Sequence, residues 1–180
     1  MDQELIGNND LRDEALQHLD ALWQTAHWFT ENERDAETLV INTYLEASKF
    51  WGNSIFVKAC KTQMFKVLLK ILFGKNKLNF RLQAPDNIEN MFESFPSDKI
   101  LELKAISGDI VTKAIRGLPI EIRLIMVLSI FEKFSYQEIA EIIGSHKKTV
   151  RNNIYHGYML LRQDIVNSYS VGDSKIAIGS

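Results

Sequence analysis

The 180-residue chain contains one cysteine and three prolines, and it has no long hydrophobic run. A single cysteine, Cys60, excludes an intramolecular disulfide and a cysteine-based zinc site, and it is typical of a reducing cytosol. No apolar stretch approaches the ~20 residues that cross a bilayer, and the acidic, polar N-terminus does not resemble a signal peptide. We therefore expect a cytoplasmic protein without membrane insertion.

Groups suited to catalysis are also scarce. The four histidines and the carboxylates show no metal-ligand spacing, no nucleophile stands at an informative offset from a histidine, and there is no glycine-rich phosphate loop. We expect no metal, no cofactor and no enzymatic activity.

Helical periodicity dominates the sequence and strand-like alternation is nearly absent, so the predicted fold class is all-α. We expect two small helical domains, residues 1–75 and 105–166, joined by a linker over residues 76–104 and followed by a flexible tail over residues 167–180. The helices expected before the helix-turn-helix span about residues 10–28, 33–50, 55–73, 98–116 and 121–133.

The C-terminal domain carries a helix-turn-helix pattern. Ser135 and Glu138 have the spacing of a capping box, which predicts a helix start, and Gly144 predicts its end. Ala140, Gly144 and Val150 stand at the offsets that this motif uses for a small crossing residue, a turn glycine and a branched wedge.

The second helix of the motif has a polar face without acids. On a helical wheel Val150, Ile154, Gly157 and Leu161 define the core side, and the opposite side carries Lys148, Arg151, Asn152, Tyr155 and Met159. Lysine and arginine suit phosphates or guanine, and asparagine can pair with adenine in the major groove. The alternative is the solvated face of an ordinary helical hairpin.

A second basic segment lies in the N-terminal half. Residues 54–83 carry seven bases and no acid, although residues 1–53 carry eleven acids and three bases. Within it Lys58, Lys61, Lys66 and Lys70 share one helix face, after a turn bordered by aromatic residues. Aromatic rings can stack on unpaired bases while lysines follow the phosphates, so we expect DNA here, provided that no internal carboxylate neutralises the lysines.

These pieces together resemble an extracytoplasmic-function (ECF) sigma factor, a small bacterial RNA polymerase subunit. NERDAETLVINTYLEASKF (residues 32–50) is similar to the family's polymerase-binding helix. LPIEIRLIMVL (residues 118–128) and FSYQEIAEIIG (residues 134–144), followed by Thr149 and Val150, are similar to its second domain. The resemblance implies a promoter-specificity subunit that acts with core RNA polymerase on promoter DNA and is held off by an anti-sigma factor.

The resemblance also implies roles for individual residues. The β′ clamp helices of polymerase would contact Asp35, Glu37, Leu39, Val40 and Tyr44, and the β flap would contact the second domain. The −10 element would be opened and bound by Trp51, Asn53, Phe56, Lys58, Lys61 and Thr62. The −35 groove would receive Lys147, Lys148, Thr149, Arg151, Asn152 and Tyr155.

Some positions depart from the family pattern. Lys61-Thr62 stands where an Arg-Asn pair is usual, Lys66 stands where an acid is usual, and Gly157 lies in the middle of the recognition helix. A glycine there costs roughly 1 kcal/mol of helix propensity relative to alanine. The alternative function is a stand-alone helix-turn-helix regulator that binds a palindrome as a dimer, and a third is a helical protein-binding adaptor.

Overall fold

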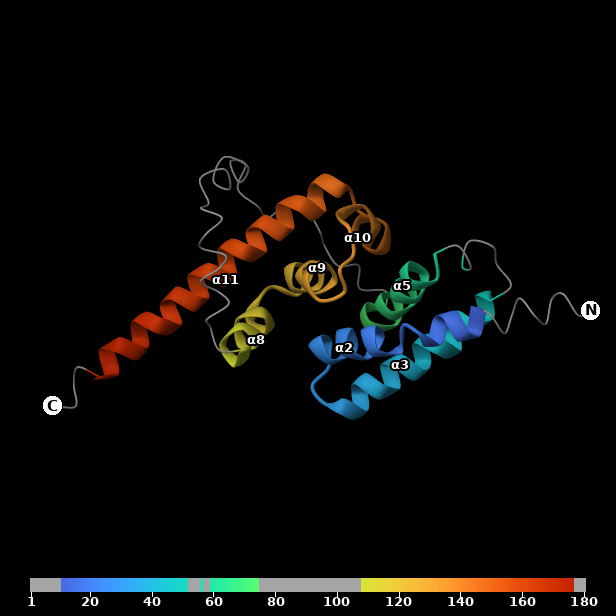
Figure 1. Cartoon of the computed structure of the whole chain (residues 1–180), viewed down its shortest axis with the longest axis horizontal. Helices are drawn as coiled ribbons and strands as arrows, with labels where there is room; N and C mark the ends of the chain where they lie inside the picture. Colours follow the sequence, from blue (N-terminus) through green and yellow to red (C-terminus); the bar gives the residue numbers. More distant parts are fainter. Residues whose placement is uncertain (1–10, 52–55, 57–58, 75–107, 177–180) are drawn as a thin grey trace, which may run out of the picture. The chain divides into compact units, whose positions relative to one another are not determined.

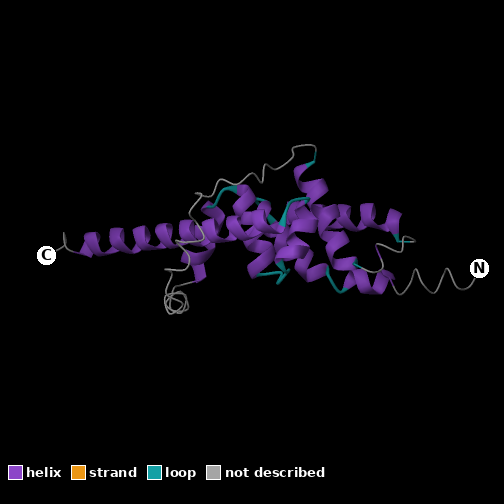
Figure 2. Ribbon diagram, turned by 90° about the horizontal axis from the view of Figure 1, so that it is seen from above, coloured by secondary structure: helices purple, strands orange, loops and turns teal. Residues whose placement is uncertain are grey.

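The computed structural model describes residues 11–51, 56, 59–74 and 108–176. Over these residues the regular structure is helical and no strand occurs, so the predicted all-α class is confirmed (Figure 2). No helix in these ranges is both long enough and apolar enough to cross a membrane. The whole of the predicted linker, residues 76–104, and the first part of the helix expected over residues 98–116 lie outside the described residues.

The helices follow the expected order, with shifts at their ends (Figure 1). Their bounds are α2 Leu19–Phe29, α3 Glu33–Ala47, the 3-10 helix η1 Ser48–Phe50, α5 Cys60–Phe73, α8 Gly108–Gly117, α9 Ile120–Ile130, α10 Tyr136–Ile143 and α11 Lys147–Ile176. A short helical segment over residues 11–16 precedes α2. The last helix continues to Ile176, where a flexible tail was expected from residue 167; it contains no proline that would stop it.

The chain forms two compact units whose boundaries differ from the sequence-based domains. The first unit combines Met1–Asn79 with Val127–His146, and the second combines Phe80–Met126 with Lys147–Ser180. In the first unit α2, α3 and α5 pack against one another, and α10 packs on α5. Because the end of α9 and all of α10 join the N-terminal helices, this unit is discontinuous in sequence.

The predicted first helix is interrupted before α2. Residues 11–16 are helical, residues 17–18 form a turn, and α2 begins at Leu19 with a backbone at His18 of φ −98° and ψ 6°. The hydroxyl of Tyr44 donates a 2.7 Å hydrogen bond to the carbonyl of Ala15. The Ala15 carbonyl therefore accepts a hydrogen bond from a side chain of α3 at the point where the regular hydrogen bonding of the first helical segment stops.

Capping residues set the other boundaries largely as predicted. The Asn32 side chain accepts a 2.9 Å hydrogen bond from the backbone N–H of Asp35 and so caps α3. Gly74, at φ 55°, ends α5, and Gly144, in the left-handed conformation, ends α10. The Ser135–Glu138 capping box is present, and its hydrogen bonds lower the pKa of Glu138.

Gly157 has a packing role in the second unit. A Cβ built at this position would lie 2.7 Å from Sδ of Met126 and 3.0 Å from Cγ2 of Ile122. Both neighbours belong to α9 and are almost fully buried. The glycine that departs from the family pattern is therefore the residue that lets α11 approach α9.

We predict that Gly157→Ala lowers stability even though alanine favours the helix. Overpacking costs about 1–3 kcal/mol, which exceeds the roughly 1 kcal/mol gained in propensity, so the net loss should be about 1 kcal/mol. Urea and thermal unfolding would measure it. Gly117→Ala is the matched control, because a Cβ there meets nothing within 4 Å; a Gly157→Ala protein as stable as the Gly117→Ala protein would contradict the packing role.

Candidate nucleic-acid and polymerase interfaces

The start of α11 presents the clearest surface for an anion. Lys147 and Lys148 are exposed at its first two positions, and no acid lies in its first turn. The free backbone N–H groups and the helix dipole at this end add to the positive charge of both ammonium groups. The site is suited to a phosphate or to the acceptor edge of a base.

Further along α11, the expected face is only partly accessible. Thr149, Arg151 and Tyr155 are half-buried, whereas Asn152 is 7% exposed, so the expectation that Asn152 points outward is wrong. The Asn152 Oδ1 atom is buried and accepts no hydrogen bond from the residues described. Because Asn153 and Val150 are buried as well, the covered arc of the helix is wider than the four apolar positions indicated.

The candidate −10 face of α5 is engaged within the first unit. Lys61 donates a 2.8 Å hydrogen bond from Nζ to the backbone carbonyl of Glu132, and its Nζ lies 3.9 Å from the Glu132 carboxylate. The same ammonium group lies 4.5 Å from the ring centroid of Phe134, a cation–π distance. Lys61 is thus held by the connection between α9 and α10.

Two other lysines of this face also have carboxylate partners. Lys66 Nζ is 2.8 Å from Glu141 Oε1 on α10, and Lys70 Nζ is 3.8 Å from Glu46 Oε1 on α3. The expectation that this face is free of internal carboxylates is therefore wrong. The partners stand far from the lysines in the sequence, so the acid-free composition of residues 54–83 did not reveal them.

The remaining candidate −10 residues are buried, half-buried or outside the described residues. Thr62 is 6% exposed and Phe56 is 4% exposed, so neither side chain is offered to a ligand in this structure. Trp51 is half-buried, and its Nε1 atom is buried without an acceptor among the described residues. Asn53 and Lys58 lie outside the described residues.

Glu132 is the buried carboxylate of the α9–α10 connection, and it contacts both Thr25 and Lys61. Its side chain is buried and accepts a 3.1 Å hydrogen bond from the hydroxyl of Thr25. Burial raises the pKa of Glu132, while the Thr25 hydrogen bond and the charge of Lys61 oppose the rise. Lys133 adopts a left-handed conformation at φ 60°, which costs a residue with a Cβ of order 1 kcal/mol.

The Lys133 turn sends the residues on either side of it inward. Phe134 is 5% exposed, and its ring meets that of Phe65 edge-on at a centroid distance of 4.9 Å. Trp28 and Phe131 pack with centroids 5.0 Å apart. Burial of Phe134 against Phe65 offsets the strain of the turn, and the contact between Trp28 and the more exposed Phe131 also holds the connection against α2.

The candidate polymerase-binding residues on α3 also divide into two groups. Asp35 and Glu37 are exposed, whereas Leu39 and Val40 are buried in the first unit. Tyr44 donates its hydrogen bond to the Ala15 carbonyl, and burial of the phenol, with smaller effects of Cys60 and Asp20, raises the pKa of Tyr44 to about 12. Leu39, Val40 and Tyr44 therefore hold α3 in place.

Sequence reasoning missed two residues on the accessible side of α3. Ile41 and Leu45 are 51% and 61% exposed, and they follow Glu37 at steps of four residues. This spacing places all three on one face of the helix. The helical periodicity of α3 assigned other apolar positions to the core and gave Ile41 and Leu45 no role.

Comparisons with known proteins bear on these surfaces. Residues 108–161 match the protein family described as sigma-70, region 4. The chain is 25% identical over 153 residues to the ECF RNA polymerase sigma factor SigE of Mycolicibacterium smegmatis. This alignment covers 81% of the chain and 58% of the relative, so the chain spans a little over half the length of the curated relative it matches.

We predict that the Glu132→Gln protein becomes more stable relative to the parent protein as the pH rises. The folded-state pKa of Glu132 is raised above its ordinary 4.5, so its contribution is full below that value and is lost as the pH rises through the folded pKa. Glutamine remains uncharged and can still accept from Thr25, so the variant should gain on the parent between pH 4.5 and 8 in urea unfolding.

Glu132→Ala is the companion variant for this experiment. It leaves the hydroxyl of Thr25 buried without its acceptor, and it should lose about 1–3 kcal/mol. A Glu132→Gln protein that loses stability relative to the parent as the pH rises would contradict the assigned direction of the pKa.

Proposed function

We propose that this chain, an ECF-type sigma factor, directs core RNA polymerase to specific promoters and initiates transcription there, without catalysing a reaction itself. One observation carries the proposal. The residues that match sigma-70 region 4 are those that form α8 to α10 and the first half of α11, with a capped helix-turn-helix whose second helix begins at two exposed lysines. The chain would work in the cytoplasm.

The −35 contact is assigned to the N-terminal part of α11. Lys147 and Lys148 supply the accessible charge, and Thr149, Arg151 and Tyr155 follow within two turns. Phosphate contacts from the lysines would set the register, and Arg151 and Tyr155 would reach base edges. Asn152 is given no base contact in this arrangement, because its side chain is buried.

The contact with the β′ clamp helices is assigned to the exposed side of α3. Asp35 and Glu37 provide negative charge, and the strip formed by Ile41 and Leu45 provides apolar area. An apolar centre with a charged rim is the usual composition of a protein interface. The β flap would contact the region 4 helices, and an anti-sigma factor would compete for the same surfaces.

Binding of the −10 element requires a change in the first unit. Lys61 and Lys66 are engaged by Glu132 and Glu141, and the segment that carries these acids packs on α5. DNA phosphates can replace the two carboxylates as partners of the lysines once that segment has moved. The free chain should therefore bind DNA weakly, and core polymerase should relieve the block.

Run-off transcription with added core enzyme tests the function. The parent chain should give a promoter-dependent transcript, and Lys148→Ala should weaken promoter binding severalfold and reduce the salt dependence by about one phosphate contact. Arg12→Ala is the control, because Arg12 is an exposed base outside the surfaces assigned to DNA or polymerase. A chain that binds no core enzyme, or that binds a palindrome alone as a dimer, would contradict the proposal.

A separate prediction concerns the ion pair between α5 and α10. Glu141→Lys places two like charges together, so the free chain should bind single-stranded −10 DNA roughly two- to fivefold more tightly, in line with the ~0.2–1 kcal/mol of an exposed pair. Fluorescence anisotropy would measure the affinity.

Two control variants separate this effect from the change in net charge. Glu31→Lys makes the same charge change at an exposed loop position, and Lys66→Glu/Glu141→Lys keeps the net charge and restores an attractive pair. Equal affinities for the Glu141→Lys and Glu31→Lys proteins would show that the pair does not restrain DNA binding.

A further inference from the structure

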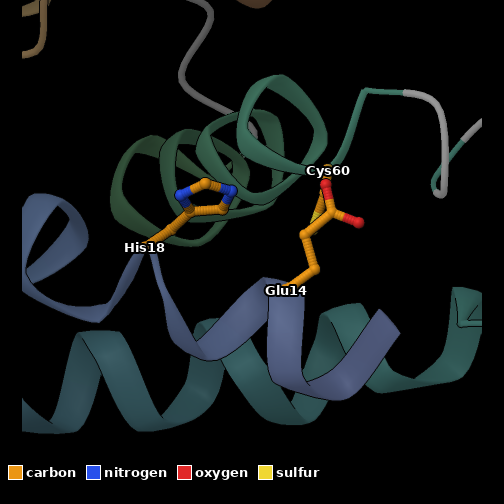
Figure 3. Close-up of side chains that lie close together, drawn as sticks. All are labelled: Glu14, His18 and Cys60. Carbon is orange, nitrogen blue, oxygen red and sulfur yellow. The ribbon is translucent and has the colours of Figure 1, made fainter. Parts of the chain in front are cut away.

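Three metal-ligating side chains meet in the first unit, beside the start of α5. Glu14, His18 and Cys60 each offer one donor atom, and these atoms lie within 4.8 Å of one another. Figure 3 shows the side chains of Glu14 and His18 rising from the segment before α2 toward the first turn of α5, which carries Cys60. The cluster therefore joins two elements that are distant in the sequence.

Local structure explains how the donors converge. Glu14 and His18 are four residues apart, a spacing that places both side chains on one side of a helical turn. The turn at residues 17–18 ends that helical segment, and no hydrogen bond to another described residue holds the His18 ring. Cys60 is the first residue of α5 and is 2% exposed.

The donor set suits one class of ion. Thiolate, imidazole and carboxylate are the three ligand types that proteins use for Zn²⁺, and three protein ligands leave a fourth position for water. Zinc–ligand bonds of about 2.0–2.3 Å put tetrahedral donors roughly 3.3–3.8 Å apart. The cluster must contract by about 1 Å, and the side chain of Glu14, which is accessible to solvent, can rotate to do so.

We propose that Glu14, His18 and Cys60 bind a single zinc-class divalent ion. The sequence argued against such a site because the chain has one cysteine and its histidines lack ligand spacing, but the fold supplies the other two donors. The ion would tie residues 14–18 to the first residue of α5, next to Lys61 and Thr62. It would thereby stiffen the end of α5 to which the −10 contact is assigned.

The binding step balances with the loss of one proton. Burial and the nearby charge of Glu14 raise the pKa of Cys60 to about 11, so the thiol is protonated at neutral pH. The ion forms a bond to sulfur as the S–H bond breaks, and the proton leaves to solvent. Burial, and then the charge of Lys61, lower the pKa of His18, so its ring is neutral and can donate a lone pair.

Titration of the metal-free full-length chain with Zn²⁺ and Co²⁺ tests the site without reference to transcription. Cobalt should give a sulfur-to-metal charge-transfer band in the near ultraviolet, and zinc should displace the cobalt and raise the melting temperature. Glu14→Gln, His18→Gln and Cys60→Ser should each weaken binding roughly tenfold or more. His146→Gln should bind as the parent does, because His146 is an exposed histidine outside the cluster.

Two results would overturn the site. One is a cobalt complex of the parent chain without the sulfur band, and the other is a Glu14→Gln protein that binds zinc as tightly as the parent. Circular dichroism of each variant separates loss of a ligand from loss of the fold, and Glu14→Gln is the variant least able to disturb the core. Failure here would leave the proposed function intact, because run-off transcription measures that function independently.

Discussion

Burial of Glu132 beside Lys61 and Thr25 is the interaction on which the first unit depends. A carboxyl group that is 6% exposed needs compensating partners, and here a hydroxyl and an ammonium group supply them from α2 and α5. The strained turn at Lys133 points Glu132 and Phe134 into the unit together. These contacts join residues 127–146 to the N-terminal helices.

This junction has a functional consequence for the proposed sigma factor. Lys61 and Lys66, two half-buried lysines of the candidate −10 face, form ion pairs with the segment that also begins the helix-turn-helix. The Lys66–Glu141 pair is partly exposed, and such pairs are weak and sensitive to salt, so phosphate can replace the Glu141 carboxylate as the partner of Lys66 once the α10 segment has moved away from α5. A modest interaction can thus restrain DNA binding without preventing it.

Local features of the fold could be predicted from the sequence, and long-range pairings could not. The Ser135–Glu138 capping box and the glycine ends of α5 and α10 are local, since each depends on residues within one turn. The partner of Lys66 is Glu141, and no periodicity connects positions so distant. The prediction that Asn152 faces outward failed for a related reason. How much of the surface of α11 is buried depends on packing against other parts of the fold, which the helical wheel does not show.

The candidate site likewise contains residues that could be placed from the sequence and residues that only the fold could place. Lys147 and Lys148 lie at an exposed helix start as the motif predicts, whereas four residues that the resemblance assigned to binding are buried here: Leu39, Val40, Phe56 and Thr62. The resemblance predicts which helix would contact a partner, and only the fold shows which face of that helix is accessible. Gly157, a departure from the pattern, is explained by its contact with Met126.

A distance measured between α5 and α10 tests the central claim most directly. Nitroxide labels at the exposed positions Lys70 and Gln137, in a Cys60→Ser background, would report that distance by pulsed electron paramagnetic resonance. The account predicts a short distance in the free chain and a longer one in the complex with core polymerase and promoter DNA. An unchanged distance in a complex that produces transcript would contradict it.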